Sequence, residues 1–589
     1  MSKSRGLFMQ AGILAATGII VRIIGLLYRS PLTAIIGDEG NGYYGYAYNC
    51  YMIALLISSY SIPSAVSKII SGKLAVGQYI YAQRTFRAAM YYVAVIGGII
   101  SLVLMIFARS FVTDPNAVPV LRIFAPTVFL FGVLGVLRGY FQAHKTMVQT
   151  SISQILEQIG NALISILMAL ILRSTVSLPE VETEEAMAAY QTSRAVRGAM
   201  GSALGTGAGV LIALVFMVML YMANRPYVHD RVFLDMHAPA PMTVVMKRLV
   251  SYVTPFLLST LVYNMTTLLN QTIYTRVMIG ARGMEGSLVA SEYGIFSGKA
   301  VLITNIPIAI AAAVSSAMIP EISAKYARKK RKAARSLAGE VIRMTMLIAI
   351  PSTVGLIALA RPVTMLLFPQ QASLAKASYL LMALAVTVAL YSFSTLTNAI
   401  LQSAGKPWTP VINSLIAIAL QAFLLWLLLY VTPLGIYAMV IALILHAVLT
   451  CLLNQMSISR YRLATINVRL YFFEPLEAAF VMGICCFVVY FLLQLLLGLV
   501  IPGAYFVNLI SVLPAILTGV YAYAFVLLRT GTVTKEELRR FPRGETLYRI
   551  ACATGIYAKK RRRTRTAKSY GQVRHTSAKK RKRKNRYGF

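Results

Sequence analysis

The sequence predicts an all-α integral membrane protein with about fourteen transmembrane helices. Hydrophobic residues make up 58% of the 589 residues and charged residues only 13%, whereas soluble proteins are about 45–50% apolar and about 25% charged. Apolar stretches of about 20 residues recur along the chain, and this is the length that an α-helix needs to cross about 30 Å of hydrocarbon. Lipid is therefore the expected solvent of the folded chain.

The predicted spans lie at about residues 7–28, 43–66, 86–107, 118–141, 150–172, 198–223, 249–274, 293–317, 338–360, 376–401, 410–431, 434–458, 474–497 and 502–528. The first apolar run follows Lys3 and Arg5 and continues without an Ala-x-Ala cleavage site, so we expect an uncleaved first span.

The basic residues predict how the chain is oriented. With the N-terminus inside, most loop lysines and arginines, including the run Lys325 to Arg335, lie on the cytoplasmic side. The positive-inside rule then places both termini in the cytoplasm of a multi-pass protein in a bacterial cell membrane. The net charge of +38 does not indicate specific nucleic-acid binding, because 21 of the 57 Lys and Arg follow Leu528.

Two short motifs occur once in each half of the chain and predict an internal repeat. Ile62-Pro63 precedes Lys68 as Ile319-Pro320 precedes Lys325, and Gln142 precedes Lys145 much as Gln402 precedes Lys406. Six spans per unit is an even number, so both units insert in the same direction. We therefore predict an N-terminal lobe at 1–235, a C-terminal lobe at 236–470, two further spans at 471–528 and a basic, largely disordered cytoplasmic tail at 529–589.

One face of the first span is small and cationic. Its residues recur at alternating steps of four and three positions: Ala11, Ala15, Gly18, Arg22, Gly25 and Arg29. An arginine inside a span costs about 2.5–3.5 kcal/mol on insertion scales, so it should face a polar cavity or a partner. Arg22 and Arg29 are therefore candidate anion ligands, with snorkelling to the headgroups as the alternative.

Further polar side chains interrupt the fifth, seventh and eighth spans. Glu157 and Asn161 lie on one stripe of the fifth span and are candidates for coupling an ion, or for hydrogen bonds between helices. Asn264 and Gln271 lie on a stripe of the seventh span, where cavity lining and helix contact are equally good interpretations. Lys299 adds a cation to the eighth span.

The balance of these charges favours an anionic substrate. Three cations, Arg22, Arg29 and Lys299, are expected in the outer half of a central cavity, against one carboxylate lower down. An exporter of organic cations should show the opposite bias. Outward movement of each negative charge is favoured by about 2.3 kcal/mol per 100 mV, so the membrane potential, or an H⁺ or Na⁺ gradient, is the expected energy source.

Catalytic motifs are absent from the sequence. It contains no P-loop, HExxH or GxSxG motif, its five cysteines lack metal or disulfide spacing, and no cofactor or metal site is predicted. Only His446 lies well inside a span, which leaves a membrane glycosyl- or acyltransferase as an alternative class. The basic tail is expected to bind anionic lipids, at about 1 kcal/mol per Lys or Arg, or to act only as a topology anchor.

Several short sequence motifs resemble those of known exporters. The six-plus-six-plus-two plan resembles the MOP superfamily, and Arg22-Ile-Ile-Gly25 with Arg29 resembles the first helix of MurJ-type lipid II flippases. Other strings resemble the branch that contains stage V sporulation protein B and the YtgP type of MurJ: Gly40-Asn-Gly-Tyr-Tyr-Gly45, Ile62-Pro-Ser-Ala-Val-Ser-Lys68, Arg138-Gly-Tyr-Phe-Gln142 and Gln154-Ile-Leu-Glu157-Gln158.

The resemblance implies a cavity between two lobes that opens alternately to each side, where cations bind the diphosphate of a polyprenyl-linked sugar. Arg22 and Arg29 match the first-helix arginines of the family, and Lys68 and Lys299 stand in for arginines of the second and eighth helices. An acidic residue expected early in the second helix has no match at Asn41 and Gly42.

The sequence therefore predicts a flippase for an undecaprenyl-diphosphate-linked sugar, with lipid II for peptidoglycan as the first candidate. A cation-coupled multidrug exporter of the same fold is the alternative transporter. The sequence does not define the oligomeric state or a role in growth versus sporulation.

Overall fold

The computed structural model describes residues 2–144, 146–180, 183–238 and 240–533, and these residues form helices without any strand. The helices are α1 (Ser2–Leu55), α2 (Ile62–Leu74), α3 (Tyr79–Tyr92), α4 (Gly98–Ile106), α5 (Ala108–Phe111), α6 (Val118–Ala143), α7 (Met147–Ser174), α8 (Glu184–Phe233), α9 (Met242–Thr275), α10 (Gly286–Ile295), α11 (Leu302–Ala327), α12 (Arg331–Ala358), α13 (Ala360–Leu367), α14 (Gln371–Ser403), α15 (Trp408–Val431), α16 (Ile436–Tyr461), α17 (Glu474–Gly498) and α18 (Ala504–Thr530). Apart from its first residues, the predicted basic tail lies outside the described part of the chain.

Twelve helices among the described residues are long and apolar enough to cross a membrane. The first of them, Ile20–Leu74, covers two predicted spans, because α1 continues through a bend into the second. The predicted seventh span, α9, is not among the twelve. The all-helical membrane fold is thus confirmed, and the number of fourteen spans stays a prediction.

Gly37 divides α1 into two helices. A straight helix of 54 residues would be about 80 Å long, far more than one bilayer crossing needs. Gly37 has φ 73° and ψ 177°, a conformation that side chains disfavour and that glycine adopts readily. The second span therefore starts at Asp38, a few residues earlier than the sequence pattern predicts.

The second span and the third, eighth and thirteenth contain short π-helical segments. These are η1 (Leu56–Tyr60), η2 (Val93–Gly97), η5 (Phe296–Val301) and η6 (Arg469–Phe473), and η4 (Arg276–Ala281) follows the end of α9. A π-helical turn widens the helix, interrupts its regular hydrogen bonding and is frequent at functional sites. Lys299 lies in η5.

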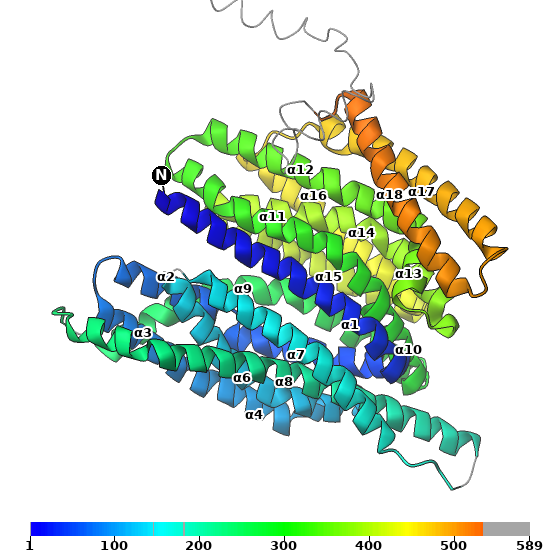
Figure 1. Cartoon of the computed structure of the whole chain (residues 1–589), viewed down its shortest axis with the longest axis horizontal. Helices are drawn as coiled ribbons and strands as arrows, with labels where there is room; N and C mark the ends of the chain where they lie inside the picture. The colour runs from blue at the N-terminus through cyan, green and yellow to red at the C-terminus, as the bar shows by residue number, and fades with distance from the viewer. Residues whose placement is uncertain (1, 145, 181–182, 239, 534–589) are drawn as a thin grey trace, which may run out of the picture.

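The helices form two groups (Figure 1). In that view α2, α3, α4, α6, α7 and α8 lie in the lower group, and α11, α12, α14, α15 and α16 lie in the upper group. The pair α17 and α18 packs on the edge of the upper group against α12. The predicted lobe boundary falls in the connection between α8 and α9, and α9 itself packs against both α3 and α15. The lobe boundaries stay predictions.

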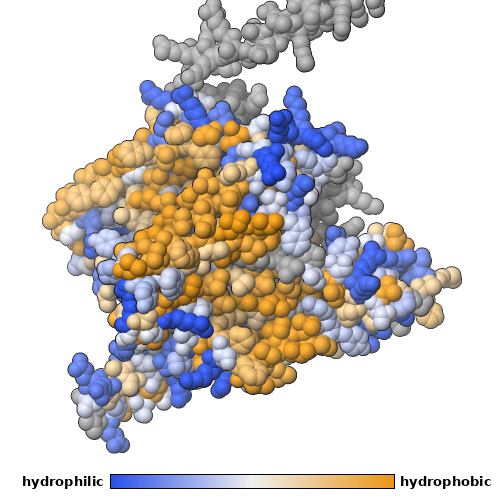
Figure 2. Space-filling model, turned by 180° about the vertical axis from the view of Figure 1, so that it is seen from behind, coloured by the Kyte–Doolittle hydropathy of each residue, from blue (hydrophilic) through white to orange (hydrophobic). Residues whose placement is uncertain are grey.

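Apolar side chains cover much of the outer surface. Figure 2 shows a broad hydrophobic face, with hydrophilic residues gathered toward its margins. Many of the exposed large residues are leucines and phenylalanines of α7, α15, α17 and α18, such as Leu163, Phe423, Phe487 and Leu517. A soluble protein rarely exposes a contiguous apolar surface of this extent, so this surface faces lipid.

Helix α1 packs on α7 and α8 of the lower group, and its second half crosses α10 at very short range. A Cβ atom added to Gly42 would lie 1.9 Å from the carbonyl oxygen of Ala290, and one added to Gly294 would lie 1.8 Å from that of Asp38. No side chain fits at such distances, so glycine is required on both helices for this backbone contact. We call this crossing the α1–α10 contact.

The variant Gly294→Ala is predicted to separate α1 from α10, at a cost of about 1–3 kcal/mol for overpacking. Hydrogen–deuterium exchange of the 286–295 peptide should become faster. Gly280→Ala is the control, because a Cβ atom there meets nothing within 4 Å. Equal exchange in both variants would contradict the proposed packing.

Candidate functional site

A cavity of about 1300 Å³ lies between the two groups of helices. Its walls come from α1, α6, α7 and α8 on one side and from α9, α11, α14 and α15 on the other. It reaches from Tyr44 and Arg29 on α1 to Gln402 and Pro407, at the far ends of the C-terminal helices. The cavity is therefore closed near the α1–α10 contact and extends toward the opposite end of the bundle.

Arg22 and Arg29 both line this cavity, as their shared helix face predicts. Arg22 is exposed to it. The guanidinium of Arg29 lies 4.5 Å from the ring centroid of Tyr44 and 5.8 Å from that of Tyr28. Neither arginine has a carboxylate partner among the described residues. Their positive charges are thus available to a ligand in the cavity.

Three tyrosines of the second span form an aromatic wall that the sequence reasoning missed. Tyr44, Tyr48 and Tyr51 line the cavity, and the rings of Tyr44 and Tyr48 stack with centroids 5.6 Å apart. Their spacing of four and then three residues places them on one helix face, which is the signal that could have identified them. Aromatic faces also attract cations, so this wall holds Arg29 in the cavity.

Glu157 also lines the cavity, but it is paired. Its Oε2 accepts a hydrogen bond from a terminal nitrogen of Arg138 at 2.7 Å, and Arg138 Nε donates to Ser153 Oγ at 2.9 Å. Arg138 is buried on α6. In the sequence Arg138 stands out only as part of a motif, because a partner on another helix has no signature in a single sequence. The pair neutralises Glu157, the one carboxylate among the described residues that line the cavity.

Asn161 and Asn264 lie on the cavity wall as well. Asn161 donates to Tyr28 Oη at 3.4 Å and accepts from Ser165 Oγ at 2.9 Å. Gln271, in contrast, is buried outside the cavity lining, where its Oε1 accepts from Asn49 Nδ2 at 2.5 Å. It joins α9 to α1, which agrees with the helix-contact interpretation of its stripe.

Lys299 is placed away from the cavity lining. Its side chain is 1% exposed, and its Nζ lies 2.6 Å from Asp38 Oδ1 and donates to Ser373 Oγ at 2.6 Å. Because Asp38 begins the second span directly after the bend at Gly37, an acidic residue does stand early in the second helix. The absence noted at Asn41 and Gly42 followed from placing the start of that span too late.

The Asp38–Lys299 pair joins the two groups of helices beside the α1–α10 contact. Close by, Lys376 on α14 pairs with Glu292 on α10, and Tyr274 Oη donates to the same carboxylate at 2.7 Å. These charges hold α10 against its neighbours. Together they close the end of the cavity near Gly37.

Lys68 lies at the edge of the site. It is exposed on α2, and its Nζ lies 4.7 Å from the ring centroid of Tyr252 on α9, which lines the cavity. Lys68 is therefore next to the cavity end that lies opposite the α1–α10 contact, and in this conformation it binds the facing helix.

The sequence and the fold of this chain are similar to those of known membrane proteins. The family "Lipid II flippase MurJ" matches residues 80–511. The chain belongs to the MurJ family. It is 25% identical to stage V sporulation protein B of Bacillus subtilis (strain 168) over 539 residues, which cover 90% of this chain and 96% of the relative.

Solved structures share the fold of this MurJ family member. Lipid II flippase MurJ in an inward closed conformation superposes with a TM-score of 0.58 at 14% identity, covering 87% of this chain and 98% of that chain. An outward-facing multidrug resistance MATE family transporter of the MOP superfamily superposes with a TM-score of 0.51 at 16% identity, covering 77% and 96%. The predicted resemblance to exporters of the MOP superfamily is confirmed at the level of the fold.

Membership of the MurJ family makes the chain a multi-pass plasma membrane transporter and not an enzyme. His446, the residue on which the transferase alternative depended, is buried on α16 with its Nδ1 3.2 Å from Tyr391 Oη, outside the cavity lining. The described residues contain no group of His, Cys, Asp and Glu that could hold a metal ion.

Asp38→Asn is predicted to open the closed end of this MurJ family member. Removing one partner of a buried pair costs about 3–5 kcal/mol, because the remaining charge is left uncompensated; Lys299 then favours conformations in which it reaches water. Spin labels on α1 and α14 should report longer distances. The double variant Asp38→Asn/Lys299→Met removes the buried charge and should return toward the wild-type distances, whereas unchanged distances in the single variant would exclude this gating role.

Proposed function

We propose that this chain moves an undecaprenyl-diphosphate-linked sugar from the inner to the outer leaflet by alternating access, with lipid II as the first candidate for this substrate. Family membership supports a lipid-linked precursor as the cargo. The similarity to stage V sporulation protein B makes a precursor used in sporulation the next candidate.

The observation that carries the proposal is the charge balance of the cavity. Arg22 and Arg29 face it without a carboxylate partner among the described residues, while Glu157 is neutralised by Arg138. Arginine donates several hydrogen bonds in a plane and suits phosphate oxygens. A diphosphate would therefore bind near Arg22 and Arg29, and the sugar would extend into the remaining volume. A cation exporter would need a carboxylate that is not already paired.

The conformation fits one step of such a cycle. The end near Gly37 is closed by the α1–α10 contact and the Asp38–Lys299 pair, and the cavity extends to Gln402 and Pro407. With both termini in the cytoplasm, as the positive-inside rule predicts, this state receives its substrate from the inner leaflet. Outward opening requires that the Asp38–Lys299 pair separate while the helices around the opposite cavity end, near Gln402 and Pro407, come together.

The membrane potential assists this direction of transport. With a negative cytoplasm, each negative charge that moves outward gains about 2.3 kcal/mol per 100 mV. Glu157 is the proposed site at which H⁺ or Na⁺ binds during the return step, when movement of the helices separates it from Arg138. The basic tail, which lies outside the described residues, is proposed to bind anionic lipids.

Replacing either Arg22 or Arg29 by Gln is predicted to lower transport about ten- to hundredfold, because hydrogen bonds from a charged group contribute about 1.5–3 kcal/mol each. Transport is measured in proteoliposomes with labelled lipid II and an impermeant reagent that modifies only outer-leaflet molecules. Arg109→Gln, an exposed arginine outside the cavity, controls for net charge. Full transport by folded Arg22→Gln and Arg29→Gln would reject the proposed site. The preference for lipid II is tested with the same polyprenyl diphosphate carrying a different sugar.

The double variant Arg138→Gln/Glu157→Gln is predicted to lose the part of transport that responds to an imposed H⁺ or Na⁺ gradient and to keep the part driven by membrane potential. Both partners are replaced so that neither charge is left buried alone. Proteoliposomes with each gradient imposed separately give the measurement. A gradient response equal to that of the wild type would remove Glu157 from the coupling mechanism.

A further inference from the structure

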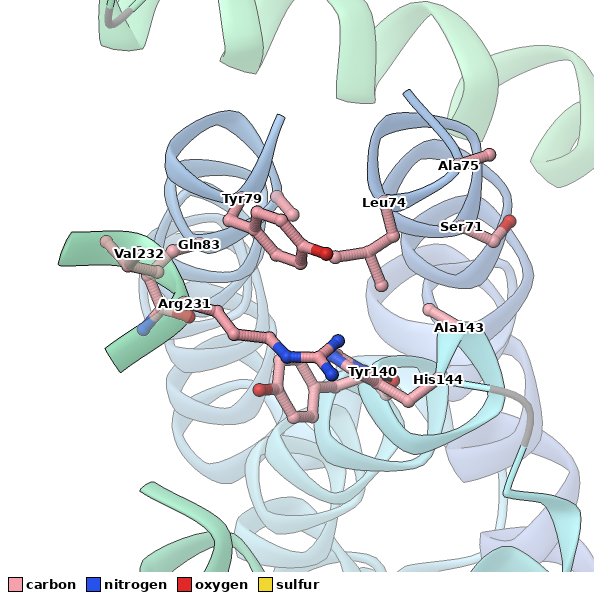
Figure 3. A pocket seen from close by; sticks show the side chains of 11 residues that line it. Ser71, Leu74, Ala75, Tyr79, Gln83, Tyr140, Ala143, His144, Arg231 and Val232 are labelled. Carbon is pink, nitrogen blue, oxygen red and sulfur yellow. Dashed lines mark hydrogen bonds between the residues drawn. The ribbon is translucent and has the colours of Figure 1, made fainter. Parts of the chain in front are cut away.

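A second, smaller pocket of about 240 Å³ lies apart from the central cavity and shares no lining residue with it. It is formed where α2, α6 and α8 end and α3 begins, so it lies at one end of the helix bundle. Its wall residues are shown in Figure 3: Ser71, Leu74, Ala75, Tyr79, Ala82, Gln83, Tyr140, Ala143, His144, Arg231 and Val232. We call it the α8-end pocket.

Two buried polar atoms on the wall of the α8-end pocket have no protein partner. Tyr140 is only 3% exposed, and its hydroxyl oxygen makes no hydrogen bond. Gln83 donates from Nε2 to Tyr221 Oη at 3.3 Å, but its Oε1 is buried without a partner. A buried polar group without a hydrogen bond costs about 1–3 kcal/mol. Both atoms are therefore suited to bind a polar ligand.

Arg231 supplies a positive charge to the same pocket. In Figure 3 its side chain extends across the pocket toward Tyr140 and His144. The guanidinium lies 5.7 Å from the ring centroid of Tyr79, a contact that holds it over the pocket. A phosphate oxygen is the natural ligand of a guanidinium in this setting.

His144 adds a hydrogen-bond acceptor. Its Nδ1 donates to the carbonyl oxygen of Tyr140 at 2.9 Å, so in the neutral ring Nε2 carries the lone pair. Burial lowers the pKa of His144 despite the bond to Tyr140, and the charge of Arg231 lowers it further, so the ring is neutral at neutral pH. The pocket thus offers one cation, one hydroxyl and two acceptors, Gln83 Oε1 and His144 Nε2.

Exposed apolar side chains lie beside the pocket, with Asp235 and His237 among them. Val76 beside α2, and Phe233, Leu234 and Met236 at the end of α8, are 61%, 83%, 76% and 100% exposed. Water disfavours such a group of side chains, whereas the interface of a bilayer, where spanning helices end, accommodates them. A lipid whose headgroup enters the pocket would cover these side chains with its acyl chains.

We propose that the α8-end pocket binds a phosphodiester group that carries hydroxyl or ammonium donors, as in the headgroups of phosphatidylglycerol and phosphatidylethanolamine. The phosphate lies at Arg231 and Tyr140, and the donors of the headgroup bond to Gln83 and His144. The volume is below the range of about 300–1,000 Å³ for pockets of drug-sized ligands, which suits a small headgroup and excludes a lipid-linked sugar. The site is independent of the proposed transport substrate.

The test uses the full chain purified in detergent and native mass spectrometry with added lipid. Phosphatidylglycerol should bind more tightly than phosphatidylcholine, whose headgroup has a phosphodiester but no hydrogen-bond donor. Arg231→Gln should weaken phosphatidylglycerol binding about tenfold, as expected for a charged hydrogen bond. Tyr140→Phe, which keeps the ring packed against Phe86 and removes only the unbonded hydroxyl, should weaken it about threefold.

Arg225→Gln is the matched control, because Arg225 is an exposed arginine on the same helix and outside the pocket. A second experiment adds glycerol phosphate, which has no acyl chains, as a competitor. If it displaces the lipid, the ligand class includes soluble phosphate esters; if it does not, the site is specific for membrane lipid. The proposal would be overturned if Arg231→Gln and Arg225→Gln weakened phosphatidylglycerol binding equally, or if phosphatidylglycerol and phosphatidylcholine bound equally well. Neither result affects the transport assay for Arg22 and Arg29.

Discussion

The cost of placing charge in the membrane interior is the constraint on which this structure depends. An uncompensated basic side chain inside a span is unfavourable by several kcal/mol, and the chain meets this cost in two ways. Arg138 forms an ion pair with Glu157, and Lys299 forms one with Asp38. Arg22 and Arg29 have no such partner in the described structure and instead face a large cavity. Only the second solution leaves positive charge for a substrate.

The same distinction explains how much of the site could be predicted from the sequence. The alternating spacing of four and three residues identifies Arg22 and Arg29 on one face, and Glu157, Asn161 and Asn264 also prove to line the cavity. Periodicity reports which residues share a helix face, but it carries no information about the helix that packs against that face. Lys299 and Gln271 therefore could not be placed, because Asp38 and Asn49 belong to the other half of the chain.

The fold shows the same limit at the level of helices. Hydrophobic length predicts the all-helical membrane class, and most spans agree with the observed helices within a few residues. The start of the second span differs, since a new helical segment begins directly after the bend at Gly37 and includes Asp38 and Glu39. The close packing of Gly42 on Ala290 was equally invisible, because a glycine at a helix crossing and a glycine in a loop look alike in one sequence.

The bend in α1 connects the two functions of this helix. Arg22 and Arg29 lie before Gly37 and face the cavity, whereas Asp38 and Gly42 lie after it and close one end. A ligand shifts a conformational equilibrium only by binding one state better than another. Arg29, the proposed ligand of the diphosphate, precedes Asp38 by nine residues, which is about 14 Å along a helix. Any tilt of the first half of α1 that improves diphosphate binding would change the angle at Gly37. The geometry therefore allows substrate binding to act on the Asp38–Lys299 pair through one short piece of backbone, without contact between the substrate and Lys299.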